Sequence, residues 1–409
     1  MPHAEPANRP RPEPAVVVIA AGVCAALHVG KLPPAITTLG EAMGLSLVQA
    51  GFLLSLVQAA GMSLGLVFGA VADGLGLRRS MIAGLCVLGV ASLLGGAATG
   101  VPALMLLRAL EGFGFLLVVL PAPGLVRQLL PAGRVTAMLG VWGAYMPLAT
   151  ALALLLGPPC IAALGWRGWW WGLGALSLVA AAALARAVPR PRATAAGTVA
   201  PGPGWAARLR DTLAAPGPWL VAVTFAMYSG QWLAVIGFLP AIYAQAGVSG
   251  AATAVLTALA AAANIVGNVA SGRLLQRGVP APRLLALGFA TMGVAAVAAF
   301  AGGPGAGLPG PLRYAAVLAF SGFGGLIPAT LFALALRLVP GPGAVSTTIG
   351  WVQQWSALGQ FAGPPGVAWV AAQAGGWQWT GAATAACSAL GLLLTLAITR
   401  LLRPRAARG

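Results

Sequence analysis

Four ionisable side chains lie inside long apolar runs of this 409-residue sequence, where a charge is costly unless it is paired or faces a wet cavity. His28 and Lys31 stand three positions apart, as do Arg108 and Glu111, so each pair shares one face of a helix. Two cations and one carboxylate form a net positive site that attracts a small anion. Histidine exchanges a proton near neutral pH. The four residues therefore predict anion binding at Lys31 and Arg108, and proton coupling through His28 or Glu111.

Each of these residues also has a plainer structural explanation. Lys31 can extend its ammonium group toward the outer membrane interface. Arg108 and Glu111 can form a pair that only holds their helix in place, and His28 can simply hydrogen-bond a neighbouring helix. The sequence leaves these alternatives open.

The elements that position these side chains are membrane helices. The chain is 59% hydrophobic and 7% charged, with a mean hydropathy of +0.90, which is more apolar surface than a soluble fold can bury. A helix of about 20 apolar residues crosses a hydrocarbon core of about 30 Å. The apolar runs predict an all-α membrane protein with twelve transmembrane helices, at approximately 16–37, 47–72, 80–98, 102–126, 136–160, 168–187, 217–243, 250–272, 283–301, 312–337, 344–371 and 378–400.

The basic residues indicate orientation rather than a surface for nucleic acid. The net charge of +17 is spread over short clusters between the apolar runs. With the N-terminus inside, only Arg167 and Arg313 of the 23 Lys and Arg residues fall outside, and Lys31 and Arg108 fall within spans. The other 19 occupy inner segments, which the positive-inside rule assigns to the cytoplasm. We expect both termini in the cytoplasm and no nucleic-acid partner.

The predicted helices divide six and six. The Pro-, Gly- and Arg-rich stretch 188–216 is typical of a linker, with a short interfacial helix near 205–213. Recurrence of Gly112-Phe-Gly as Gly322-Phe-Gly, and of Gly157-Pro-Pro as Gly363-Pro-Pro, supports two pseudo-repeats. The predicted organisation is a disordered cytoplasmic tail at 1–15, an N-terminal six-helix bundle at 16–187, a cytoplasmic linker at 188–216, a C-terminal six-helix bundle at 217–402 and a basic cytoplasmic tail at 403–409.

A polar segment from Gly69 to Arg79, with the sequence GAVADGLGLRR, predicts a tight loop between the second and third spans. Its pattern Gly-x-x-x-Asp-x-x-Gly-x-Arg-Arg resembles the loop signature between helices 2 and 3 of the major facilitator superfamily. Leu104-x-x-x-Arg108-x-x-Glu111-Gly112-x-Gly114 resembles the fourth-helix motif of that family, and Gly157-Pro158 resembles its fifth-helix motif. The resemblance covers nearly the whole chain. Lys31-Leu-Pro-Pro looks somewhat like the cyanate and nitroimidazole type of bacterial transporter.

The resemblance implies a secondary transporter of the bacterial cell membrane that moves a small solute by rocking two halves around a central site. Helices 1 and 4 line that site in the family, so the four ionisable residues would form one polar cluster. Residues that match the loop signature, or that could bend the fifth span, are predicted to act in conformational gating. They are Gly69, Asp73, Gly76, Arg78, Arg79, Gly157 and Pro158.

Further predicted substrate contacts are aromatic and amide side chains that could line the same cavity, although packing is the plainer explanation of each. They are Tyr145, Tyr228, Gln231, Trp232 and Gln354. The expected partners are a small anionic solute, protons and the lipid bilayer. We expect a monomer with no cofactor, no metal site and no catalytic residue, and no phosphate-binding loop is visible.

Two other functions stay in view. Drug efflux usually requires acidic cavity residues that hold cationic compounds, and Glu111 is the one candidate in the spans. A membrane enzyme or receptor would need a catalytic cluster or a sensing domain, and the sequence displays neither.

Overall fold

The computed structural model describes residues 13–190, 205–302, 307–341 and 344–402, with the side chains of 68–75, 132–133, 136–137 and 140 outside the description. All regular elements within these ranges are helices. The first half contains α1 Pro14–Gly30, η1 Pro33–Ala35, α2 Ile36–Met43, α3 Leu47–Ser55, η2 Leu56–Gln58, α4 Ala59–Leu75, α5 Leu77–Gly96, α6 Val101–Val119, α7 Ala122–Leu129, α8 Ala132–Trp142 and α9 Tyr145–Ala187. The remainder contains α10 Trp205–Ala214, α11 Pro216–Gln245, α12 Gly250–Gln276, α13 Ala281–Phe300, α14 Gly310–Gly324, α15 Leu326–Arg337, α16 Val345–Gln373, η4 Trp377–Trp379 and α17 Thr380–Leu402.

Most of these helices are long and apolar enough to cross a membrane. Within the described ranges, ten candidate spans meet both conditions. One of them, α9, has 43 residues and contains the sixth predicted span and most of the fifth, which begins instead in α8. The two parts of α9 meet at Gly165, with φ 70° and ψ 168°. Glycine adopts such angles without a steric penalty. Counting α9 as two spans, and adding the 29-residue α16, gives the twelve predicted helices.

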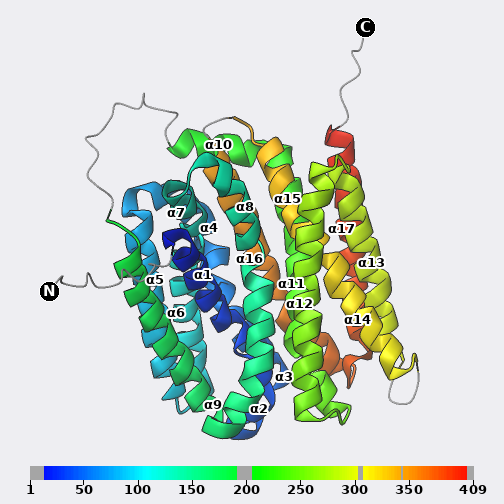
Figure 1. Cartoon of the computed structure of the whole chain (residues 1–409). Helices are drawn as coiled ribbons and strands as arrows, with labels where there is room; N and C mark the ends of the chain where they lie inside the picture. The colour runs from blue at the N-terminus through cyan, green and yellow to red at the C-terminus, as the bar shows by residue number, and fades with distance from the viewer. Residues whose placement is uncertain (1–12, 191–204, 303–306, 342–343, 403–409) are drawn as a thin grey trace, which may run out of the picture.

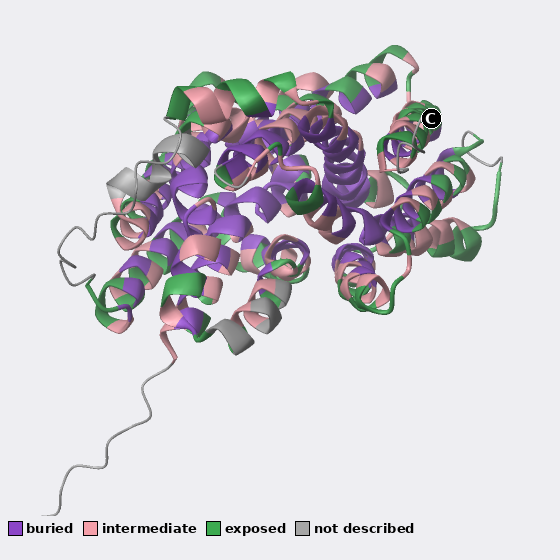
Figure 2. Ribbon diagram, turned by 90° about the horizontal axis from the view of Figure 1, so that it is seen from above, coloured by how far each residue is buried: buried purple, intermediate pink, exposed green. Residues whose placement is uncertain are grey.

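Apolar side chains cover the outside of the bundle. Leu106, Val266 and Val294 are each at least 70% exposed, as expected of surfaces that face lipid. Viewed from above, buried residues gather in the central helices and exposed residues lie at the periphery (Figure 2). The most apolar stretches of the spans formed by α1 and α11 are 78% and 83% buried, so these two helices are central.

The two halves lie side by side, with α1 to α9 on one side and most of α11 to α17 on the other (Figure 1). Helix α16 of the second half packs against α3 and α4 of the first, and α12 packs against α9. A Cβ atom added at Gly61 would lie 3.0 Å from the Cβ of Ala357, and one at Gly65 would lie 3.0 Å from the Cβ of Gln354. Glycine therefore allows α4 and α16 to approach closely along this contact.

The loop predicted from Gly69 to Arg79 is largely helical, so its predicted length is wrong. Helix α4 continues to Leu75 and α5 begins at Leu77, which leaves Gly76 as the connection. Gly76 has a φ of 77°, a left-handed angle that favours glycine and turns the chain within one residue. Arg78 then anchors the start of α5, because its Nε donates to the carbonyl oxygen of Val188, 2.8 Å away.

A short helix is present in the predicted linker. It is α10, which packs against α11 and α16 and lies at the end of the bundle where α17 ends (Figure 1). Trp219 Nε1 donates to the carbonyl oxygen of Leu213 at 2.8 Å, which ties α10 to α11. Trp205, at the start of α10, is 63% exposed.

Candidate functional site

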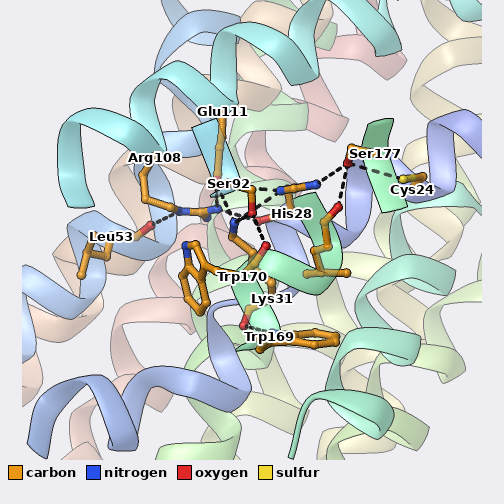
Figure 3. Close-up of polar contacts among 11 residues, drawn as sticks. Cys24, His28, Lys31, Leu53, Ser92, Arg108, Glu111, Trp169, Trp170 and Ser177 are labelled. Carbon is orange, nitrogen blue, oxygen red and sulfur yellow. Dashed lines mark hydrogen bonds and ion pairs between the residues drawn. The ribbon is translucent and has the colours of Figure 1, made fainter. Parts of the chain in front are cut away.

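A buried polar cluster joins α1 and α6 inside the first half. Its four ionisable members are the predicted ones, and each has 0% relative exposure: His28, Lys31, Arg108 and Glu111. Side chains from α5 and α9 complete it, and the close-up shows all of them converging on one point (Figure 3). The sequence supplied the two pairs, and the packing of α1 against α6 brings them together.

The Glu111 carboxylate is the centre of the cluster. One carboxylate oxygen, Oε1, binds Lys31 Nζ, and the other, Oε2, lies 2.6 Å from Arg108 Nη1. His28 Nδ1 lies 3.8 Å from Oε1. The carboxylate thus bridges Lys31, the residue that follows α1, and an arginine from its own helix through buried, charge-assisted contacts.

Lys31 turns into the protein rather than toward the membrane interface. Besides Glu111, its Nζ contacts Ser92 Oγ at 2.9 Å and His28 Nδ1 at 3.4 Å. The ammonium also lies 4.6 Å from the centroid of the Trp170 ring, a cation–π distance. Complete burial and these partners rule out the snorkelling explanation for this conformation.

Arg108 connects three helices. Its Nε donates to the carbonyl oxygen of Leu53 in α3 at 3.1 Å, and its Nη1 donates to the carbonyl oxygen of His28 in α1 at 2.7 Å. Nη2 is buried and has no hydrogen-bond partner in the described part of the chain. With His28 neutral, the cluster holds two cations and one carboxylate, so it has a net positive charge and one unused cationic donor.

A separate cavity of about 50 Å³ lies between the two halves. Its polar lining residues are neutral: Gln58, Tyr145, Gln353, Ser356 and Gln360. The volume is far below the roughly 300–1,000 Å³ of ligand pockets, so the cavity is narrow in this conformation. Phe115, which also lines the cavity, follows Glu111 by one helical turn on α6, so the charged cluster and the cavity are neighbours.

A hydrogen bond links the two halves at this cavity. Gln58 Nε2, in η2, donates to Gln360 Oε1, in α16, at 3.0 Å. Gln354 makes a second link, because its Oε1 accepts the backbone N–H of Leu66 at 2.8 Å. Gln58 and Gln360 were missed in the sequence analysis, and the available signal was an amide side chain within each apolar run.

Of the neutral predicted contacts, only Tyr145 lines this cavity, where its ring stacks on Trp142 with centroids 4.4 Å apart. Apart from Gln354, the second-half candidates bond within their own half instead. Tyr228 accepts from Asn264 Nδ2 at 2.9 Å, and Trp232 Nε1 donates to Ser321 Oγ at 3.1 Å.

Gln231 shares this pattern, because its Oε1 accepts from Ser388 Oγ at 2.9 Å and its Nε2 donates to the carbonyl oxygen of Met227 at 2.9 Å. These bonds are what the packing explanation expects. Gln231, Tyr228 and Trp232 hold helices of the second half together in this conformation.

The predicted gating residues are only partly described. Gly69 and the side chain of Asp73 fall in the segment whose side chains the structure does not describe. Arg79 is exposed. At Gly157 an added Cβ would lie 2.6 Å from Pro34 Cγ, so this glycine permits a close contact between α9 and η1. The backbone stays helical at Pro158, and the non-helical residue within α9 is Gly165.

Comparisons with known proteins support a transporter. A puromycin resistance protein of Streptomyces alboniger is 34% identical over 183 residues, 44% of this chain and 36% of that protein. A chloramphenicol resistance protein of Streptomyces lividans is 31% identical over 271 residues, 64% of this chain and 66% of that protein. The chain thus spans about a third and just under two thirds of the lengths of these relatives.

Crystal structures of a bacterial homolog of the human lysosomal transporter Spinster share the fold. The inward-facing unoccupied form has a TM-score of 0.72, with 97% of this chain and 95% of that chain covered. The inward-facing occupied form has a TM-score of 0.73, with 94% and 96% covered, and both are 16% identical in sequence. The family described as the Major Facilitator Superfamily matches residues 18–364, and this chain belongs to that family.

Proposed function

We propose that this protein is a proton-coupled secondary transporter that moves a small solute with an anionic group by alternating access. The observation that carries the proposal is the buried, net positive cluster around Glu111, with one cationic donor, Arg108 Nη2, left without a partner in the described residues. A membrane protein does not usually bury an uncompensated cation without a functional use.

Anion binding follows from the hydrogen-bond inventory of Arg108. Two of its nitrogens are occupied by backbone carbonyls and by Glu111, and Nη2 has no partner among the described residues. Leaving a buried charged donor without a partner costs about 1–3 kcal/mol or more. A carboxylate or small inorganic anion that reaches Nη2 would remove that cost and neutralise the cluster.

Proton coupling follows from the position of His28. Histidine is a common proton acceptor in proteins. The His28 ring touches the ammonium of Lys31 and lies near the carboxylate of Glu111. A proton gained or lost at His28 or Glu111 therefore changes the charge that a bound anion meets. The neutral cavity between the halves provides the path, once the Gln58 to Gln360 bond opens.

The wider organisation belongs to the same proposal. Bundles at 16–187 and 217–402 rock about the cavity, the linker 188–216 and both termini face the cytoplasm, and the protein acts as a monomer in a bacterial cell membrane. Gly69, Asp73, Gly76, Arg78 and Arg79 act in gating. Within the family, we place the chain near the cyanate and nitroimidazole type.

Drug efflux is the alternative function. The names of the two Streptomyces relatives, puromycin and chloramphenicol resistance proteins, favour it. Glu111 would then hold a cationic compound, although both of its oxygens are already bound to Lys31 and Arg108.

A thermal-shift screen of the purified protein separates these functions. A ligand at about 100 times its dissociation constant stabilises a protein by about 2.7 kcal/mol. We expect small anions such as acetate, cyanate and nitrate to stabilise the protein, and Lys31→Met or Arg108→Gln to abolish the effect. Arg167→Gln is the matched control, because this arginine binds the carbonyl oxygen of Gly96 away from the cluster. Stabilisation by tetraphenylphosphonium or puromycin that disappears in Glu111→Gln would replace the anion proposal with efflux.

A further inference from the structure

The Ser177 hydroxyl contacts the Nε2 nitrogen of His28. The Ser177 hydroxyl donates to the carbonyl oxygen of Leu173, one turn earlier on α9, at 3.0 Å. A serine hydroxyl has a single proton, so toward His28 Nε2, 2.8 Å away, it acts as the acceptor. Neutral His28 is therefore protonated at Nε2 and bare at Nδ1.

The bare Nδ1 faces Lys31. Ser92 Oγ donates its proton to the carbonyl oxygen of Trp170 at 2.8 Å, so it too accepts from the Lys31 ammonium. The three ammonium protons then have three acceptors: Ser92 Oγ, Glu111 Oε1 and His28 Nδ1. The donors and acceptors around Lys31 balance only when Nδ1 carries no proton.

We propose that protonation of His28 at Nδ1 displaces Lys31 from Glu111, and that Ser177 is the positioning residue that makes Nδ1 the site of protonation. A proton on Nδ1 removes an acceptor of the ammonium and places two cations beside Glu111 Oε1, which lies 3.8 Å from Nδ1. The imidazolium and the ammonium then compete for one carboxylate oxygen. Lys31, once released, becomes available to an anionic solute, so this inference rests on the proposed proton-coupled transport.

Among the described groups around His28, Glu111 carries the single negative charge for which Lys31 and a protonated His28 would compete. From its own helix, α1, Lys31 faces it, and Cys24 approaches through Ser177 at 3.6 Å between Sγ and Oγ. From α6, Glu111 faces the ring and Arg108 binds its backbone carbonyl. From α9 the uncharged Ser177 hydroxyl contacts Nε2, and from α5 the uncharged Ser92 hydroxyl contacts Lys31 beside the ring. Among these described groups, Glu111 is the only anion, so a second cation at Nδ1 displaces the first.

The composition of the chain makes a direct test possible. The sequence contains two histidines and one lysine, so the variant His3→Gln, labelled with ¹⁵N in histidine and lysine, gives signals from His28 and Lys31 alone. We expect the ring nitrogens of neutral His28 to report the Nε2–H tautomer. On acidification, the Lys31 Nζ signal should shift with the same midpoint as the His28 ring. The inference would be overturned if neutral His28 carried its proton on Nδ1. It would also be overturned if the Lys31 Nζ signal did not change when His28 is protonated.

Ser177→Ala tests the positioning role. Loss of one hydrogen bond, with a net value of about 0.5–1.5 kcal/mol, should lower the preference for the Nε2–H tautomer by about 2- to 13-fold. Ser92→Ala is the matched control, because it removes an acceptor of Lys31 and leaves the Nε2 contact of His28 in place. It should move the Lys31 signal without changing the tautomer ratio, and an unchanged ratio in Ser177→Ala would refute the role.

These measurements need no solute, so a negative result for the His28 switch can be told apart from a negative result for the proposed anion transport. If the tautomer and the linked midpoints are as expected while Lys31→Met leaves binding of acetate, cyanate and nitrate intact, the switch stands and the anion proposal falls. If anions bind and Lys31→Met abolishes the binding while His28 is protonated at Nδ1 when neutral, the switch falls and the anion proposal stands.

Discussion

Glu111→Gln is predicted to destabilise the fold strongly, because it leaves two buried cations without their carboxylate. Glu111 has 0% relative exposure and accepts from Lys31 and from Arg108. Hydrogen bonds to charged groups contribute about 1.5–3 kcal/mol each. Glutamine keeps one acceptor oxygen but places an NH2 donor against the other cation, so one of these bonds is lost and both cations lose the negative charge. Removing one partner of a buried ion pair typically destabilises a protein by about 3–5 kcal/mol, because the other charge is left uncompensated. We expect the free energy of unfolding to fall by about 3–5 kcal/mol.

Lys31→Met is the informative comparison within the cluster. It leaves Arg108 paired with Glu111 and therefore balanced in charge, and the thioether can pack beside the Trp170 ring. The substitution still leaves buried acceptors without the ammonium as donor, which should lower the free energy of unfolding by about 1–3 kcal/mol. We therefore predict that Glu111→Gln destabilises the fold more than Lys31→Met does, although each substitution changes the formal charge by one unit.

Glu13→Gln is the matched surface control. Glu13 pairs with Arg134, and their side chains are 37% and 58% exposed. An exposed pair of this kind contributes about 0–1 kcal/mol. The assay is unfolding by sodium dodecyl sulfate titration from mixed micelles, followed by circular dichroism. The reasoning is wrong if Glu111→Gln costs no more than Glu13→Gln, or less than Lys31→Met.

Two further predictions concern contacts between helices. Gly112→Ala should lower the thermal midpoint by an amount equivalent to about 1–3 kcal/mol, because the added Cβ would lie 2.4 Å from a backbone carbonyl oxygen of η2. Gly172→Ala, which meets nothing within 4 Å, should be neutral or slightly stabilising in the same melt. Gln58→Leu removes the 3.0 Å bond to Gln360 and should favour the open cavity by about 2- to 13-fold. The readout is the rate of thiol labelling of Ala357→Cys in a background without the four native cysteines, and an unchanged rate would contradict it.

Much of the fold was predictable from local sequence. Each transmembrane helix needs a run of apolar residues long enough to cross the hydrocarbon core. This is a local property of the sequence, so the helices and their approximate order could be predicted directly. The pairing of Arg108 with Glu111 was equally local, since residues three apart on a helix are neighbours. The predicted loop at Gly69 to Arg79 was wrong in length, because polar residues mark a chain reversal without showing that Gly76 alone completes it.

The sequence by itself determined an all-helical membrane protein of the superfamily and placed its four ionisable groups on two helices. The tertiary structure decided what each group meets. Lys31 turns inward because packing of α1 against α6 brings Glu111, 80 positions away, within reach, and Ser92 and Ser177 join from α5 and α9. Likewise Gln58 meets Gln360 across 302 positions. Helical periodicity fixes neighbours three or four residues apart, whereas the rotation of each helix depends on distant partners.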